Sequence, residues 1–242
     1  MDDTIFLPGG RDARGTLDVA SGGDGVAGSD SVAGSDDGSG SGACVVACPP
    51  HPQRGGHRGD GRLRAVSAAL GDGGTDCLRF DYGAWDGGRG EREDALRAVA
   101  WAGERYDRVG LFGYSAGGTI ALSAAARGAD VTAVAALAPP ARLGAAREDG
   151  RPPTDDPVPG DAVGGIDTLN ELASIPLSVP VGVFYGAHDD VATVTPVAER
   201  ARERGATVTT FDSGHSFAGR EADVATAVAT FLRPALYPDV SR

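Results

Sequence analysis

The stretch RVGLFGYSAGGTIALSAAARG at residues 108–128 indicates the fold more clearly than any other part of the chain. Its first part, RVGLFGY, is apolar and typical of a buried strand, whereas AGGTIALSAAARG predicts a helix of small residues that ends at a glycine. The junction contains the pentapeptide GYSAG, a G-x-S-x-G pattern, at residues 113–117. We therefore expect a sharp strand-to-helix turn with Ser115 at its tip.

The alternative interpretation of this pentapeptide is a tight turn whose serine has no chemical role. With 38 glycines among 242 residues the bare pattern can arise by chance, so its context has to decide. The strand before it and the helix after it favour the strained elbow that exposes a nucleophile. The flanking glycines agree with this, because side chains there would collide with the neighbouring strand and helix. We expect Ser115 to be a nucleophile.

The same alternation of strand and helix continues along the chain. Strands are expected at 43–48, 76–82, 108–114, 131–139, 179–187 and 207–212, and helices at 62–70, 91–106, 116–128, 167–173, 196–205 and 221–236. This pattern is typical of the α/β class, with a doubly wound, mostly parallel sheet and helices on both faces. Residues 1–20 predict an N-terminal antiparallel hairpin. The length fits one domain over residues 1–242.

Two segments lack this periodicity. Residues 21–42 consist almost entirely of Gly, Ser, Asp and Ala and predict a flexible acidic loop inserted between strands, with a functional tether as the alternative. Residues 140–165 form a polar connection rich in Pro and Gly, with a short helix after it. This connection is too short and polar for a large helical lid, so we expect a minimal lid and an open pocket.

A serine hydroxyl is a weak nucleophile and needs a base that is oriented by an acid. His215, in the segment DSGHSF, follows the last expected strand and should lie at the same sheet edge as Ser115. Asp189, in GAHDD, is the favoured acid, because the Gly-x-x-Asp spacing places its carboxylate just past the preceding strand. The alternatives are an exposed loop histidine at 215 and Asp190 as the acid. His188 is expected to be a structural neighbour.

Acyl transfer also needs two backbone N–H groups that face the developing oxyanion. Ala116, directly after the nucleophile, is expected to supply one. The loop HPQRGG after the strand at 43–48 is expected to supply the other. Pro52 has no N–H, so Gln53 is the favoured donor. His51 is interpreted as a support for this loop, rather than as a metal ligand or a second base.

The charge balance is unusual, with 34 acidic against 22 basic residues, all of them arginine, and a net charge of −12. Such an acidic, lysine-free composition is similar to that of haloarchaeal proteins, and in molar salt the Debye length is only about 3 Å. The alternative is a GC-rich genome, which explains the missing lysine but not the acidity. The chain shows no basic stripe for nucleic acid, no membrane span and no secretory signal. We expect a cytoplasmic protein.

Three cysteines, Cys44, Cys48 and Cys77, are a sparse and odd set. Cys44 and Cys48 fall four residues apart on one expected strand, roughly 13 Å at ~3.3 Å per residue, which is too far for a disulfide. A zinc site would need more ligands at closer spacing. We expect buried free thiols and no metal.

The segments PPHPQRGG, LRFDYGAWDGGRGE, GYSAGG, YGAHDD and GHSF together resemble the α/β-hydrolase superfamily. In particular they are similar to its small, lid-poor, dienelactone-hydrolase-like members, from about Ala43 to Leu236. The resemblance implies the α/β-hydrolase fold and the chain order Ser115, Asp189, His215 for a catalytic triad. Dienelactone hydrolases often carry a cysteine nucleophile, so the serine at position 115 argues against dienelactone cleavage itself.

These features predict a serine hydrolase that cleaves a small carboxylic ester or related acyl bond through an acyl-enzyme on Ser115. No cofactor is required for that reaction. Tyr114, Trp85 and Tyr82 are candidates to line the substrate pocket, with core or surface packing as the equal alternative. A peptidase, an acyltransferase or a non-catalytic binding protein of the same fold stay open, because fold-level similarity does not choose a substrate. The sequence leaves the oligomeric state undetermined.

Overall fold

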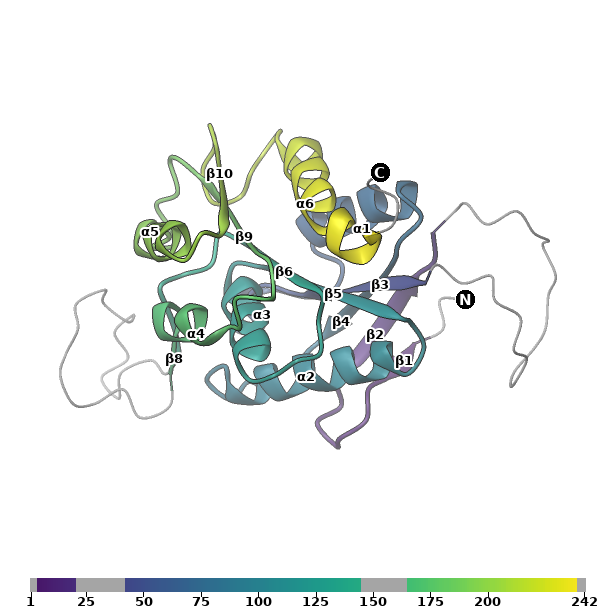
Figure 1. Ribbon diagram of the computed structural model, residues 1–242. Coiled ribbons are helices and arrows are strands. Elements are labelled where there is room, and N and C mark those ends of the chain that lie inside the picture. The colour runs from purple at the N-terminus through teal and green to yellow at the C-terminus, as the bar shows by residue number, and fades with distance from the viewer. Residues whose placement is uncertain (1–3, 21–41, 145–164, 239–242) are drawn as a thin grey trace.

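The computed structural model describes residues 4–20, 42–144 and 165–238. An eight-stranded sheet forms its centre, in the order β1-β2-β4-β3-β5-β6-β9-β10 (Figure 1). The strands are β1 Ile5–Phe6, β2 Arg14–Asp18, β3 Ala43–Cys48, β4 Asp76–Asp81, β5 Arg108–Tyr114, β6 Ala133–Leu137, β9 Val181–Gly186 and β10 Thr207–Phe211. The pairs β1–β2 and β2–β4 are antiparallel and all other pairs are parallel. This confirms the predicted sheet and N-terminal hairpin.

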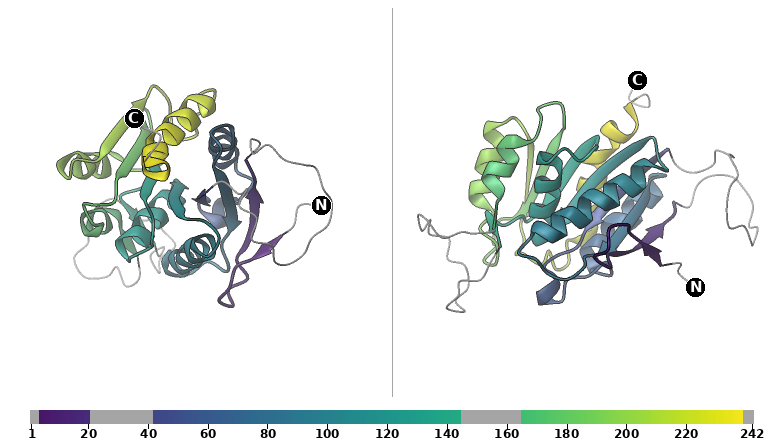
Figure 2. Two further views of the ribbon diagram at one scale, coloured as in Figure 1. Left: turned by 45° about the vertical axis from the view of Figure 1, so that its right-hand side comes forward. Right: turned by 90° about the horizontal axis from the view of Figure 1, so that it is seen from below.

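Helices cover both faces of the sheet (Figures 1 and 2). On one face, α1 (Gly61–Asp72) packs against α6 (Glu221–Leu236). On the other face, α2 (Arg89–Gly103) contacts α3 (Ala116–Ala126), which in turn contacts α4 (Thr168–Ser174). Helix α5 (Thr195–Glu203) packs against α4 and the strands β9 and β10. The predicted helices are therefore all present, with ends that differ by a few residues.

The central strands are apolar because both of their faces are covered. Every residue of β3, ACVVAC, and of β6, AVAAL, is buried. In a parallel sheet with helices on both sides neither face meets water, so a continuous apolar run replaces the alternating pattern of a half-exposed strand. The edge strand β10, TVTTF, is only partly buried. Cys44, Cys48 and Cys77 are buried free thiols in this core, as predicted.

The sheet reverses its direction of winding between β3 and β5. From β3 the chain moves outward to β4, and β5 then returns to the other side of β3. Loops that follow the strands on either side of such a switch point diverge and leave a crevice at the carboxyl ends of the strands. The segment after β3 and the turn after β5 both lie at this place. They carry Gln53 and Ser115, respectively.

Several predictions fall on parts of the chain outside the described residues. The acidic loop expected at 21–42 lies there except for Gly42, and so do residues 145–164 of the segment on which the minimal lid was predicted. Two short strands, β7 (Arg142–Leu143) and β8 (Ile166–Asp167), form an antiparallel pair that the sequence analysis missed. Within the described ranges, none of the helices is long and apolar enough to cross a membrane.

Candidate active site

Ser115 occupies a strained turn between β5 and α3. Its backbone φ is 55°, in the left-handed region that non-glycine residues rarely adopt. The chain can turn this tightly because residues 113 and 117 are glycines. A Cβ on Gly113 would lie 2.0 Å from the carbonyl oxygen of Gly117, and one on Gly117 would lie 2.2 Å from that of Cys48. These contacts explain the spacing of the G-x-S-x-G pattern, since neither position has room for a side chain.

The side chains of Ser115, His215 and Asp189 form a continuous chain of hydrogen bonds. His215 Nε2 lies 3.1 Å from Ser115 Oγ, and His215 Nδ1 lies 2.8 Å from Asp189 Oδ2. With a neutral ring, Nδ1–H donates to the carboxylate and Nε2 accepts the hydroxyl proton. The three residues come from the loops after β5, β9 and β10. The structure therefore brings together all three side chains that the sequence suggested as nucleophile, acid and base.

Asp189 is held in its charged form. Burial alone would raise the pKa of its carboxyl group, but the hydrogen bond from His215 and the backbone N–H groups of Ala192 and Val191 outweigh this, so the pKa lies below its ordinary value. The two N–H groups donate to Oδ1 at 2.9 and 3.0 Å and leave Oδ2 for the imidazole. The carboxylate side chain is only 3% exposed. Asp189 therefore presents a fixed negative charge to Nδ1.

The two residues on either side of Asp189 are exposed. His188 Nε2 pairs with Asp212 Oδ1 at 2.9 Å on the surface, so His188 is a neighbour of the site and has its own acidic partner. The carboxylate that His215 contacts belongs to Asp189, whereas Asp190 is exposed. The aspartate at the predicted spacing after β9 is thus the one whose carboxylate contacts His215, and its role as the acid stays a prediction.

Tyr114 supports the backbone of His215, the base of the triad. The residue is 3% exposed, and its hydroxyl donates to the carbonyl oxygen of His215 at 3.1 Å. Burial raises the pKa of this hydroxyl to about 12, so it keeps its proton. The guanidinium of Arg62 lies over the ring of Tyr114, with the guanidinium carbon 4.6 Å from the ring centroid. Arg62 was not predicted as part of the site, since in the sequence it looks like any other arginine at the start of a helix.

Tyr82 has a comparable supporting role. It is buried, and its hydroxyl donates to the carbonyl oxygen of Pro49 at 3.2 Å, under the loop that follows β3. For Tyr82 and Tyr114 the structure thus favours the packing alternative over the suggestion that they line a pocket. Their rings fill the space beneath two loops. No local sequence pattern distinguishes a tyrosine in such a position from one that lines a pocket. Trp85 is half-buried and stacks on His51, with ring centroids 4.1 Å apart.

The two predicted oxyanion donors differ in their surroundings. Ala116 is the first residue of α3, where backbone N–H groups have no partner within the helix. The N–H of Gln53 lies in a short 3-10 helix, η1 (Pro52–Arg54), and donates to Nδ1 of His51 at 3.3 Å. Burial and the nearby Arg54 lower the pKa of His51, which favours the neutral ring that can accept this bond. That Gln53 donates to substrate stays a prediction, because its N–H would first have to leave Nδ1 of His51.

No tight cluster of metal-binding side chains occurs in the part of the chain that the structure describes. No group of three His, Cys, Asp or Glu side chains there could hold a metal ion. The described site consists of a hydroxyl, an imidazole, a carboxylate and backbone amides.

Comparison with solved structures finds proteins of the same architecture. An α/β serine hydrolase without a lid from Xanthomonas campestris matches with a TM-score of 0.68 at 20% identity, over 96% of this chain and 94% of that chain. An esterase from Pyrococcus furiosus matches with a TM-score of 0.69 at 17% identity, over 98% and 93%. This chain has the α/β-hydrolase fold. A dienelactone hydrolase from Anabaena variabilis matches with a TM-score of 0.63 at 16% identity, over 96% and 97%.

No protein-family model and no curated protein matches the sequence. Identities this low carry the α/β-hydrolase fold alone, so the activity has to be argued from the site.

Proposed function

We propose that this protein is a serine hydrolase that cleaves small carboxylic esters through an acyl-enzyme on Ser115. The observation that carries the proposal is the continuous contact from Asp189 through His215 to Ser115 Oγ. An exposed serine with no chemical role would need neither a strained backbone nor an imidazole at 3.1 Å. The esterase from Pyrococcus furiosus, with the same fold, agrees with the proposed reaction class.

The first half of the reaction forms the acyl-enzyme. Ser115 Oγ attacks the ester carbonyl carbon while its proton moves to His215 Nε2. The imidazolium that results is stabilised by the charged carboxylate of Asp189, which also fixes the ring orientation. The tetrahedral intermediate then collapses, the bond to the alkoxy oxygen breaks, and His215 returns the proton to the leaving alcohol.

The second half releases the acid. A water molecule gives its proton to His215 Nε2 and attacks the acyl carbon, and Ser115 Oγ leaves and takes that proton back. In both halves negative charge develops on the former carbonyl oxygen. The N–H of Ala116, with that of Gln53 as the second donor, is proposed to stabilise this charge, an effect commonly worth 10²–10³-fold in rate per donor (roughly, from donor deletions).

The decisive test is labelling with a fluorophosphonate probe, which reacts only with an activated serine. We expect the wild-type protein to be labelled and the Ser115→Ala variant to remain unlabelled. Ser213→Ala is a matched control, since this serine lies in the loop of His215 but its hydroxyl donates to the Gly214 carbonyl. Absence of labelling at Ser115 in folded wild-type protein would refute the proposal.

A series of p-nitrophenyl esters from acetate to laurate then measures the acyl preference. We expect the short esters to be cleaved best, in agreement with the open pocket predicted from the sequence. Turnover of the long chains alone would contradict the preference for small acyl groups, while leaving the nucleophile in place.

A further inference from the structure

The contact between Trp85 and His51 joins two loops beside the nucleophile. Trp85 lies in the 82–88 loop between β4 and α2, and its ring is tilted by 33° against that of His51. His51 in turn accepts the N–H of Gln53. The position of the indole therefore influences, through His51, the position of the Gln53 N–H, which we propose as the second oxyanion donor.

The loop that carries His51 lies directly against the elbow of Ser115. Gly117 is so close to the end of β3 that a Cβ there would lie 2.2 Å from the Cys48 carbonyl oxygen and 2.4 Å from that of Pro49. His51 follows Pro49 by two residues. A shift of this loop would therefore displace the turn that carries Ser115.

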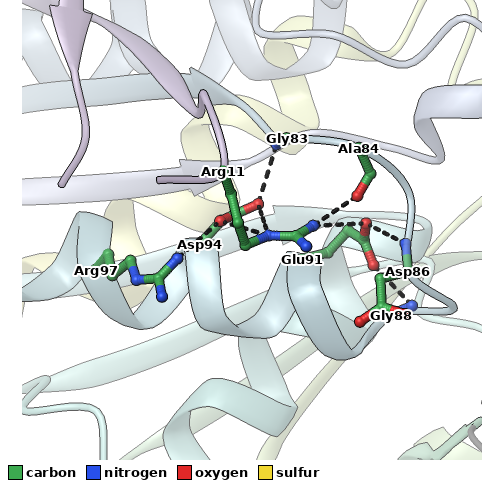
Figure 3. Close-up of polar contacts among 8 residues, drawn as sticks. All are labelled: Arg11, Gly83, Ala84, Asp86, Gly88, Glu91, Asp94 and Arg97. Atoms are coloured by element: carbon green, nitrogen blue, oxygen red, sulfur yellow. Dashed lines mark hydrogen bonds and ion pairs between the residues drawn. The ribbon is translucent and has the colours of Figure 1, made fainter. Parts of the chain in front are cut away.

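A fully buried carboxylate holds the backbone on the C-terminal side of Trp85. Glu91, in the first turn of α2, has a side chain that is 0% exposed. Its Oε1 accepts the N–H of Asp86 at 2.9 Å and its Oε2 accepts the N–H of Gly88 at 2.7 Å (Figure 3). A glutamate at this position often caps its own helix through the second of these bonds. The first bond is additional and fixes the residue next to Trp85.

An arginine from the N-terminal hairpin holds the backbone on the N-terminal side of Trp85. Arg11, between β1 and β2, donates from Nη2 to the carbonyl oxygen of Ala84 at 2.6 Å. Its Nε donates to the fully buried carboxylate of Asp94 at 3.0 and 3.2 Å, and its Nη2 lies 3.6 Å from Glu91 Oε1. Asp94 also accepts the N–H of Gly83 at 3.0 Å. Both chain neighbours of Trp85 are thus held through one ionic network (Figure 3).

The chain leaves space for this arginine at two glycines. A Cβ on Gly90 would lie 2.2 Å from the guanidinium carbon of Arg11, and one on Gly83 would lie 2.0 Å from the Arg11 carbonyl oxygen. The guanidinium therefore lies flat over the first turn of α2, in a slot that a side chain at position 90 would fill.

Charge supports the same arrangement. Burial raises the pKa of the Glu91 carboxyl group, and the backbone N–H groups and Arg11 oppose that rise. These partners all stabilise the carboxylate form. Buried ion pairs contribute little net stability compared with apolar packing of similar volume, so stability alone is a weak reason for this network.

We propose that Arg11, Glu91 and Asp94 are positioning residues that hold Trp85 against His51 and thereby keep the oxyanion loop in place beside Ser115. The kinetic part of this inference rests on the proposed esterase function. The structural part, the placement of the indole, does not. None of the three residues touches the reacting atoms, so their effect on the reaction passes through Trp85 and His51.

The test uses Trp85 fluorescence in a Trp101→Phe background, which leaves Trp85 as the single tryptophan. Gly90→Ala expels the Arg11 guanidinium from its slot while adding a better helix former to α2, so the variant should fold. Glu91→Gln keeps the shape of the side chain but replaces one acceptor by a donor, so one of the two loop bonds is lost. We expect a red-shifted emission maximum and about a two-fold rise in acrylamide quenching for both variants, as for an indole that moves toward water.

Kinetics with p-nitrophenyl acetate provide a second readout. We expect kcat to fall about ten-fold or more with KM nearly unchanged, because a displaced oxyanion amide weakens contacts made in the transition state. Arg97→Ala is the matched control. Arg97 pairs with the same Asp94 carboxylate at 3.6 Å but lies on its far side from the loop, so its removal should leave emission and kcat unchanged (Figure 3).

The outcomes separate the two proposals. Unchanged Trp85 emission and quenching in folded Gly90→Ala and Glu91→Gln would overturn the positioning role, whatever the activity. Changed emission with unchanged kcat would overturn the link to the oxyanion loop. If Ser115 is not labelled by the fluorophosphonate probe, the proposed function fails, while the emission data still decide whether the network holds Trp85.

Discussion

His215 Nε2 lies 3.1 Å from Ser115 Oγ, although 100 positions separate the two residues in the chain. The contact arises because the loops after β5 and β10 meet at one edge of the parallel sheet. With Asp189 on the other ring nitrogen, it supports the proposed acyl transfer and leads to separate predictions for each side chain.

Replacement of the base should abolish turnover. For His215→Ala we expect a fall in kcat on the order of 10⁴–10⁶-fold, since the hydroxyl of Ser115 then has no proton acceptor. His188→Ala is the control, because His188 forms an equally short pair with Asp212 at 2.9 Å but lies on the surface. Steady-state hydrolysis of p-nitrophenyl acetate measures both. Comparable losses in the two variants would contradict the assignment of His215.

Replacement of the acid should reduce turnover less completely. In Asp189→Asn the amide cannot fix the same ring tautomer, and the loss of kcat is expected to be on the order of 10⁴-fold. Asp190→Asn, one residue further along the chain, should retain activity within about two-fold, as expected for a surface substitution without a structural role. A larger loss in Asp190→Asn than in Asp189→Asn would show that the acid had been chosen wrongly.

Asp189 should also contribute to stability in a pH-dependent way. Its pKa in the folded protein lies below the ordinary value of 3.8, so its contribution is fully present above that value and is lost as the pH falls through the folded pKa. Denaturant unfolding of wild type and Asp189→Asn should therefore show a difference in free energy at pH 6 that shrinks below about pH 4. A difference that grows toward acid pH would mean that the carboxyl pKa is raised instead.

The elbow glycine should be sensitive to a single methyl group. In Gly117→Ala the new Cβ would meet backbone carbonyl oxygens of Cys48 and Pro49, which cannot move aside as a flexible side chain could. We expect a loss of about 1–3 kcal/mol or more in the free energy of unfolding. Gly103→Ala is the matched control at the end of α2, where a Cβ meets nothing within 4 Å, and it should be neutral or slightly stabilising. Equal effects would contradict the close packing at the elbow.

Salt should stabilise the folded protein if the acidic composition reflects a high-salt environment. At a net charge of −12, repulsion among carboxylates is strong at low ionic strength and is screened in molar KCl. We expect the midpoint of thermal unfolding to rise steadily between low salt and about 3 M KCl, where the Debye length is shorter than ~3 Å. Full stability without added salt would count against this prediction.

Much of the fold could be predicted because its signals are local. The strand ACVVAC at 43–48 was predicted with its observed ends, since a continuous apolar run marks a strand covered on both faces. The pair β7–β8 was missed, because strands of two residues carry no periodicity. The helix at 91–106 was shifted, since its start at Arg89 depends on the capping contact of Glu91 with the Gly88 N–H, which spacing alone does not reveal.

By itself, the sequence determined the α/β class, the place of Ser115 between a strand and a helix, and the order of Ser115, Asp189 and His215 along the chain. These features follow from short-range periodicity and from the rule that parallel strands end at one edge. Only the tertiary structure decided that Tyr82 and Tyr114 lie beneath loops and that Arg11 reaches Asp94, 83 positions away. Such contacts depend on which surfaces meet when helices and hairpin pack on the sheet, and no local spacing in the chain encodes them.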